Sequence, residues 1–505
     1  MPSLEKKRRF GAYFALNAIF IVLVLLLTNI GGSVNPRTLH VILLFAVCST
    51  WVIDLDALNG RYALLALFLS FYFVSYGLLD VGNLLSGISS EAAPSLFSAT
   101  EGVILAGAVM LALGYRTAAR MQRSAGPRRS MPRDWPWKTA LFLGIALWSI
   151  GTVVTLYWNL YIFTDASAET GRKALASISP IATAGILLAG LFQPFGILLV
   201  TYAWRSTRSV LIQCLVIAIV CGQIVFGFVI DVKGVALIGG ILVIVTYILL
   251  EGRLPIAWIA AGVVFAIVGF PILQAGRFVV HDKLSRTAVL ENLTAAVQLA
   301  IESEDRLSQL KDRPQSLLER TSVRGSIQMI VEKTGNGVAF QHGHTLTPLL
   351  ATFIPRIIWS DKVSIETGRL VNREFHVSDS EDLYLSPSIA GELYWNFGWP
   401  GVILGMAIIG AAVGALACRF NLAEAKTVTG LLVVVITIQQ VIVAFEGSFS
   451  PIYVVWFRSL AAIAILHFLF ARVTVNMKSA ISGGAIGAAP LEQSIDANAI
   501  PNLLR

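Results

Sequence analysis

Histidine, arginine, carboxylate and aromatic side chains gather between residues 341 and 410, in a chain that is otherwise mostly hydrocarbon. The stretch opens with His342 and His344, continues with Arg356 directly after a proline, and reaches Glu392 just before a long apolar run. Imidazoles and carboxylates are the side chains that most often take up or release a proton during a reaction. If the protein catalyses a reaction, the sequence predicts that it takes place near this stretch.

The two histidines allow three interpretations. On a strand or an extended loop, His342 and His344 would point the same way, which would let them bind a metal ion. A third ligand of a suitable type is not evident nearby, so we predict no metal site. One imidazole can instead accept a proton near neutral pH, or both can serve as structural hydrogen-bonding groups. The acidic run 379–382 is typical of a solvated loop, with a cation or substrate site as the alternative.

Ionisable residues also occur at the predicted outer ends of apolar segments, where a charge is costly unless it faces a cavity, a partner or a lipid headgroup. With Arg356 and the two histidines, they could converge on one polar pocket at the outer leaflet. For Glu446 and Arg458 the alternative is a structural ion pair between consecutive helices. For Lys233 and Arg277 the alternative is anchoring at the interface. The full set is Glu101, Lys233, Arg277, Glu446 and Arg458.

The elements that must position these residues are membrane helices. Hydrophobic residues make up 56% and charged residues 13% of the 505, against roughly a quarter charged in an ordinary soluble domain. The net charge of +8 does not indicate nucleic acid, because the basic residues collect in short loops between apolar segments. A crossing takes about 20 apolar residues, and a backbone surrounded by lipid must be helical. We therefore predict an all-α polytopic membrane protein with about twelve transmembrane helices. The predicted segments are 11–31, 38–54, 61–80, 98–117, 138–162, 180–204, 209–229, 234–250, 255–276, 396–418, 427–446 and 451–471.

Lysine and arginine residues set the predicted orientation. Residues 6–9 are all basic and place the amino terminus in the cytoplasm, and the basic loops that follow the even-numbered segments agree. Twelve spans return the carboxyl terminus to the cytoplasm, and the long connection between the ninth and tenth spans lies outside. The predicted domains are a bundle of spans 1–9 (1–276), a large periplasmic loop (277–395), spans 10–12 (396–472) and a disordered cytoplasmic tail (473–505).

Apolar residues recur at helical spacing in two parts of the large loop. This periodicity predicts amphipathic helices that lie on the membrane or pack over the spans. The loop is therefore predicted to be a folded cap. The residues concerned are Leu290, Leu293, Val297 and Ile301, and then Leu317, Val323, Ile327 and Ile330.

The pattern resembles a known family. The chain has about a dozen predicted spans and a large late outer loop, with Lys233 before a glycine at an outer helix start. Arg356 follows a proline and precedes Trp359 and Lys362, and residues 391–398 read Gly-Glu-Leu-Tyr-Trp-Asn-Phe-Gly before a span. These features resemble the O-antigen and exopolysaccharide repeat-unit polymerases of the Wzy type. That family is related to the O-antigen ligases, with a fold similar to the GT-C glycosyltransferases.

One spacing adds nothing to this resemblance. Some polymerases are described by an arginine followed eleven positions later by a glycine, and Arg324 and Gly335 fit that description. The loop is rich in arginine and the chain in glycine, so about one such match is expected by chance.

The resemblance implies a glycosyl transfer at the outer face of the bacterial inner membrane. The donor would be a glycan on a polyprenyl diphosphate and the acceptor a second lipid-linked repeat unit, so no cofactor or metal is implied. Arg277 and Arg356 would hold the diphosphate, with Lys233 and Arg458 as further substrate-binding cations. His342 or His344 would take the acceptor proton, with Glu392 as the alternative base. The implied partners are lipid-linked oligosaccharides, membrane lipid, a chain-length regulator and a flippase.

Two other functions remain open at the level of sequence. An O-antigen ligase, which moves finished glycan to a lipid A core, is poorly separated from a polymerase by these features. A lipid-linked oligosaccharide flippase or other transporter would more typically carry charges near the bilayer midplane and repeated halves. Here the charges favour the outer ends of the spans and one loop dominates, which favours the polymerase.

Overall fold

The computed structural model of the chain is built from helices, with no β-strand in the residues that it describes. An isolated bridge joins Thr334 and Val338. The described residues are 2–31, 36–58, 63–85, 98–124, 135–157, 180–229, 233–251, 255–258, 260, 262, 323–351, 354, 359, 367–379, 384–419, 427–442 and 447–483.

Helices occupy the predicted membrane segments wherever these fall within the described residues, so the all-α class is confirmed. The segment 255–276 lies mostly outside them. The amino-terminal helices are α1 (Pro2–Gly31), α2 (Pro36–Cys48), the 3₁₀ helix η1 (Ser49–Leu58), α3 (Ala63–Leu85), α4 (Ala99–Ser124), α5 (Trp137–Tyr157), α7 (Pro180–Thr207), α8 (Val210–Val229) and α9 (Lys233–Glu251). The carboxyl-terminal helices are α17 (Ile389–Arg419), α18 (Val428–Thr437), the π-helix η4 (Ile438–Ile442) and α19 (Phe449–Gly483).

Five helices are long and apolar enough to cross a membrane, judged by length and composition within the described residues. Shorter apolar stretches, among them Thr38–Ile53 and Val428–Val441, lie beside them. These features are compatible with an all-α membrane protein. The five candidate spans are Ala99–Met121, Trp137–Tyr157, Val210–Gly227, Ile389–Arg419 and Phe449–Leu469.

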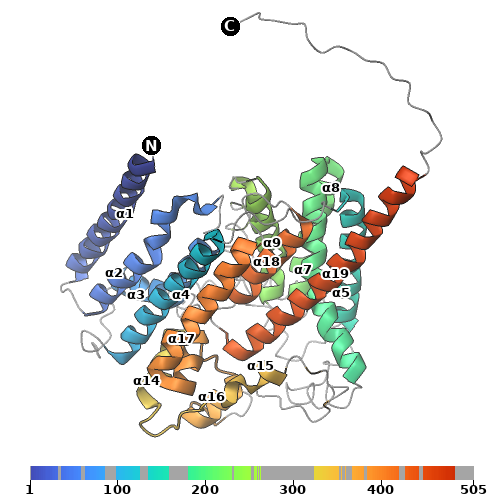
Figure 1. The fold of residues 1–505 in the computed structure, drawn as a ribbon. Coiled ribbons are helices and arrows are strands. Elements are labelled where there is room, and N and C mark those ends of the chain that lie inside the picture. Colours follow the sequence, from blue (N-terminus) through green and yellow to red (C-terminus); the bar gives the residue numbers. More distant parts are fainter. Residues whose placement is uncertain are drawn as a thin grey trace, which may run out of the picture.

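Short helices form the described part of the large loop. They are α14 (Arg324–Lys333), the 3₁₀ helix η3 (His344–Leu346), α15 (Thr347–Ala351) and α16 (Thr367–Phe375). Helix α14 buries Ile327 and Ile330, two residues of the predicted amphipathic pattern, whereas the pattern at 290–301 lies outside the described residues. Figure 1 shows α14, α15 and α16 at one end of the bundle, opposite the start of α1 and the end of α19.

Helices α4 and α17 pack closely against each other. They run in the same direction, with Gly114 against Ala407 and Gly414 against Tyr115. A Cβ atom on Gly414 would lie 2.6 Å from the Tyr115 carbonyl oxygen, so a side chain there would push the backbones apart. Small residues spaced four apart are typical of closely packed membrane helices. This contact holds α17 against α4. It therefore also helps to position the loop residues that bond to the first turns of α17.

Two boundaries differ from the prediction. Helix α17 begins at Ile389, whereas the predicted span begins at residue 396, because a bend at Gly398 joins a short polar helical segment to the apolar one. Glu392 therefore lies in a helix and not in the loop. Helix α19 continues to Gly483, so residues 473–483 of the predicted disordered tail are helical, and residues 484–505 lie outside the described part.

Candidate functional site

His342 and His344 lie on a tight turn at the loop end of the bundle. The backbone has a positive φ at His342 (46°) and at Gly343 (90°), and η3 starts at His344. Both imidazoles are exposed. The backbone here is not extended, so the condition under which the two side chains would share one face is not met. The turn leaves both imidazoles open to solvent.

The turn is attached to the bend in α17. Gly398 has φ 62° and ψ −145°, and Pro400 lacks the N–H that would normally bond to the Asn396 carbonyl one turn earlier. The bend thus leaves carbonyl groups of α17 without their usual helical partners. The N–H of Gln341 donates to the Trp395 carbonyl at 3.0 Å, and that of His342 donates to the Asn396 carbonyl at 3.1 Å. The bend supplies the acceptors that hold the histidine turn.

Glu392 lies beneath the turn and connects three elements. Its side chain is fully buried, and one carboxylate oxygen accepts hydrogen bonds from Thr345 Oγ1 at 2.8 Å and Ser450 Oγ at 3.2 Å. The other oxygen accepts from the backbone N–H of Phe449 at 2.6 Å, at the first residue of α19. A carboxylate at a helix amino terminus is favourable because of the helix dipole and the free N–H groups there. With every contact directed inward, Glu392 has the geometry of a support for the turn.

Asn396 completes this buried network. Its side-chain Nδ2 donates to Thr345 Oγ1 at 2.7 Å and to the Glu392 carbonyl at 2.7 Å. Its Oδ1 accepts from the N–H of Gly343 at 2.9 Å. The single proton of the Ser450 hydroxyl is shared between the Glu392 carboxylate and the Thr345 carbonyl, which lies 2.5 Å from Ser450 Oγ. The buried polar groups satisfy one another, and such networks make a structure rigid. Sequence reasoning missed Thr345, Asn396 and Ser450, since uncharged polar residues beside apolar runs give no periodic signal.

Aromatic rings surround the turn. The Phe340 ring lies 6.3 Å from that of His342 and 6.4 Å from that of Tyr394, measured between ring centroids. Phe397 and Trp399, on either side of the bend, are 45% and 39% exposed. Phe340 and Phe397 therefore lie close to His342 and Gly343 of the turn.

The structure describes only some of the residues that were predicted to bind the diphosphate. Arg458 lies on α19, half-buried, nine residues after the end of α19 that Glu392 contacts. Lys233 is the first residue of α9, but its side chain lies outside the described part. Arg277, Arg356 and Glu446 also lie outside the described residues, and so the diphosphate site and the Glu446–Arg458 pair remain predictions.

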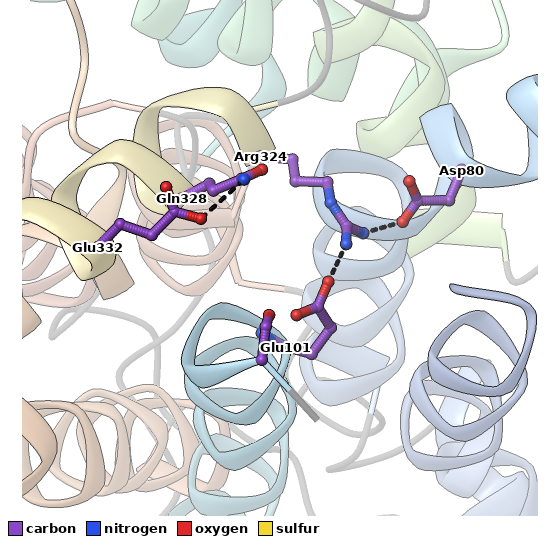
Figure 2. A network of polar contacts seen from close by, with 6 residues as sticks. Asp80, Glu101, Arg324, Gln328 and Glu332 are labelled. Atoms are coloured by element: carbon purple, nitrogen blue, oxygen red, sulfur yellow. Dashed lines mark hydrogen bonds and ion pairs between the residues drawn. The ribbon is translucent and has the colours of Figure 1, made fainter. Parts of the chain in front are cut away.

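A second polar cluster connects the loop to the bundle, and it was not predicted. Arg324, the first residue of α14, forms ion pairs with Asp80 of α3 and Glu101 of α4, as Figure 2 shows. One signal could have found it: Asp80 and Glu101 are charges inside apolar segments, and such charges are costly and need partners. Glu101 had been predicted to face an outer pocket, and the structure pairs it with the loop.

Among the described residues, no three His, Cys, Asp or Glu side chains lie together as metal ligands. What the described geometry offers is two exposed imidazoles on a rigid turn, beside aromatic rings and above a buried carboxylate network. Comparison with protein-family models, with curated proteins and with solved structures found no match to this chain.

Proposed function

We propose that the protein is a polysaccharide polymerase, a glycosyltransferase that joins polyprenyl-diphosphate-linked repeat units at the periplasmic face of the bacterial inner membrane. In this proposal it has twelve spans in a GT-C-like arrangement, both termini lie in the cytoplasm, and the loop 277–395 covers the site. The resemblance to the Wzy-type polymerases supports it, and so do the apolar helices.

The observation that carries the proposal is the histidine turn. Two exposed imidazoles lie on a backbone fixed to α17, at the end of the bundle opposite the start of α1 and the end of α19. A reaction at a lipid surface needs its base held at one end of the bundle and open to a sugar hydroxyl. The turn meets both requirements.

The proposed chemistry is a substitution at an anomeric carbon. His342 or His344 takes the proton from an acceptor hydroxyl, and the freed oxygen attacks the anomeric carbon of the donor. The bond from that carbon to the diphosphate oxygen breaks, and the diphosphate leaves with the electron pair. Arg277 and Arg356, with Lys233 and Arg458, stabilise the charge that develops on it. Guanidinium groups suit this task because they keep their charge and bind oxygens in pairs.

Complementation of a deletion strain tests the proposal. We expect the deletion to leave single repeat units on the surface, seen as one short band when the surface glycan is run on a gel. Wild-type protein should restore long chains, and the double variant His342→Ala/His344→Ala should not, with a loss of roughly 100-fold or more in polymerisation rate if one imidazole is the base. His376→Ala is the matched control, since His376 is also an exposed loop histidine on a positive-φ backbone.

Other outcomes would contradict parts of the proposal. A deletion strain with no surface glycan at all would indicate a flippase, and one whose long chains fail to reach the lipid A core would indicate a ligase. Full-length chains from the double histidine variant at normal membrane level would remove the imidazoles from the reaction. The base would then have to be a carboxylate or water.

A further inference from the structure

Arg324 is enclosed between two carboxylates from distant parts of the chain. Its Nη1 pairs with Asp80 and its Nη2 with Glu101, across sequence separations of 244 and 223 residues. All three residues are buried, with 6%, 3% and 5% of their surface exposed. On the same helix, Gln328 and Glu332 bond to each other in an exposed position, whereas the Arg324 side chain meets the two carboxylates of the bundle (Figure 2).

This arrangement is specific to arginine. A guanidinium group directs separate N–H groups at two acceptors, whereas the ammonium of lysine is a single point charge on a flexible stem. The position is otherwise unfavourable, because a cation in the first turn of a helix opposes the helix dipole. Glu101 lies in the first turn of α4, where a negative charge is favoured. The ion pairs, and not helix propensity, therefore explain why an arginine begins α14.

From Arg324 the chain leads directly to the histidine turn. Ile327 and Ile330 of α14 lie near Gly391 of α17, where a Cβ atom would be 3.6 Å and 3.3 Å from them. The Val323 N–H donates to the Ser75 carbonyl of α3 at 3.3 Å. Further on, the Ala339 carbonyl accepts from the Trp395 indole at 3.2 Å. The segment 323–346 is thus held at its start by α3 and α4 and at its end by α17.

We infer that Arg324 is the positioning residue that docks segment 323–346 on the membrane helices and thereby fixes the histidine turn. Docking is a statement about structure alone. Its consequence for glycan transfer rests on the proposed function. Loss of the guanidinium removes the counter-charge that Arg324 gives to two buried carboxylates, which is strongly destabilising. Segment 323–346 then separates from α3 and α4, and the turn loses its fixed place.

A buried cysteine reports docking independently of catalysis. Val331 is 4% exposed on α14, so in the purified protein in detergent a Val331→Cys variant should react slowly with a maleimide, after subtraction of the signal from the native cysteines. In that background Arg324→Gln should raise the labelling rate at least tenfold, and Arg324→Lys should raise it less. Arg373→Gln, which removes an exposed cation of the same loop, should leave the rate unchanged.

A triple variant keeps the test decisive if Arg324→Gln fails to accumulate. Asp80→Asn/Glu101→Gln/Arg324→Gln removes the uncompensated charge, so its membrane level should return while its labelling rate stays high. Unchanged labelling in every Arg324 variant that accumulates, the triple variant included, would overturn the docking role. If the Arg324 variants label faster but still make full-length glycan, Arg324 docks segment 323–346 and does not position the histidine turn for the reaction. A deletion strain with normal surface glycan would reject the proposed function, and the labelling result would still decide docking.

Discussion

Glu392 connects η3, α17 and α19 through a single carboxylate. The donors that it binds come from two parts of the chain: the Thr345 hydroxyl in η3, and the Phe449 backbone with the Ser450 hydroxyl at the start of α19. Hydrogen bonds to a charged acceptor are stronger than neutral ones, and a buried donor left without a partner is costly. Removal of this group should therefore affect folding before it affects chemistry.

The substitution Glu392→Gln tests this role. Glutamine keeps one oxygen for Thr345 and Ser450, but it places an amide donor against the Phe449 N–H. We expect a loss of about 1–3 kcal/mol in stability and a lower thermal unfolding midpoint of the purified protein in detergent. Glu374→Gln is the matched control, because Glu374 is exposed and its recorded ion pair is with its neighbour Arg373. An unchanged midpoint combined with lost polymerisation would instead favour Glu392 as the base.

At the level of residues, the sequence indicated which side chains could take part in a reaction, and it indicated less well where those side chains lie. His342 and His344 stood out because imidazoles are rare in this chain, and both lie exposed at the loop end. The network beneath them could not be predicted, because Thr345, Asn396 and Ser450 come together only through tertiary folding. Arg277 and Arg356 remain predictions, since both lie outside the described residues.

The bend of α17 is the element that makes the site possible. Its dihedral angles at Gly398, φ 62° and ψ −145°, lie close to a region that is essentially restricted to glycine. A straight helix would use the Trp395 carbonyl for its own ladder and would leave no acceptor for Gln341, while the Asn396 carbonyl is free for His342 because Pro400 lacks an N–H. The bend therefore combines a membrane helix with a docking edge for the loop.

The substitution Gly398→Ala should strain this bend. We expect a destabilisation of roughly 1–3 kcal/mol, shorter glycan chains and a lower unfolding midpoint. Gly240→Ala, in α9, is the control, since a Cβ atom there meets nothing within 4 Å. It should be neutral or stabilising by about 0.5–1 kcal/mol. Equal midpoints and equal chain lengths for the two variants would show that the bend does not depend on glycine at this position.

Helices could be predicted from the sequence where the pattern of hydrophobic residues alone determines them. Apolar runs marked the membrane helices, and the spacing of Ile327 and Ile330 marked α14. The predicted start of the tenth span fell at residue 396, near the bend, because polar residues before it resembled a loop. A hydropathy profile cannot show that the short helical segment before Gly398 continues, through a bend at that glycine, into the apolar helix.

For the molecule as a whole, the orientation that the basic residues indicate stays a prediction. The described loop helices lie at the end opposite the start of α1 and the end of α19 (Figure 1). What the sequence could not show is how the loop is attached. Arg324 meets Asp80 across 244 residues, and neither residue alone indicates the other.

The most direct test is chain extension with purified protein. Lipid-linked single repeat units, extracted from the deletion strain, would be mixed with the protein in liposomes and the products separated by length. A polymerase should produce a ladder of longer lipid-linked chains and release polyprenyl diphosphate, one molecule for each bond formed. The His342→Ala/His344→Ala variant should give little ladder, and His376→Ala should match the wild type. Wild-type protein that is folded in the liposomes and leaves the repeat units unextended would contradict the polymerase assignment.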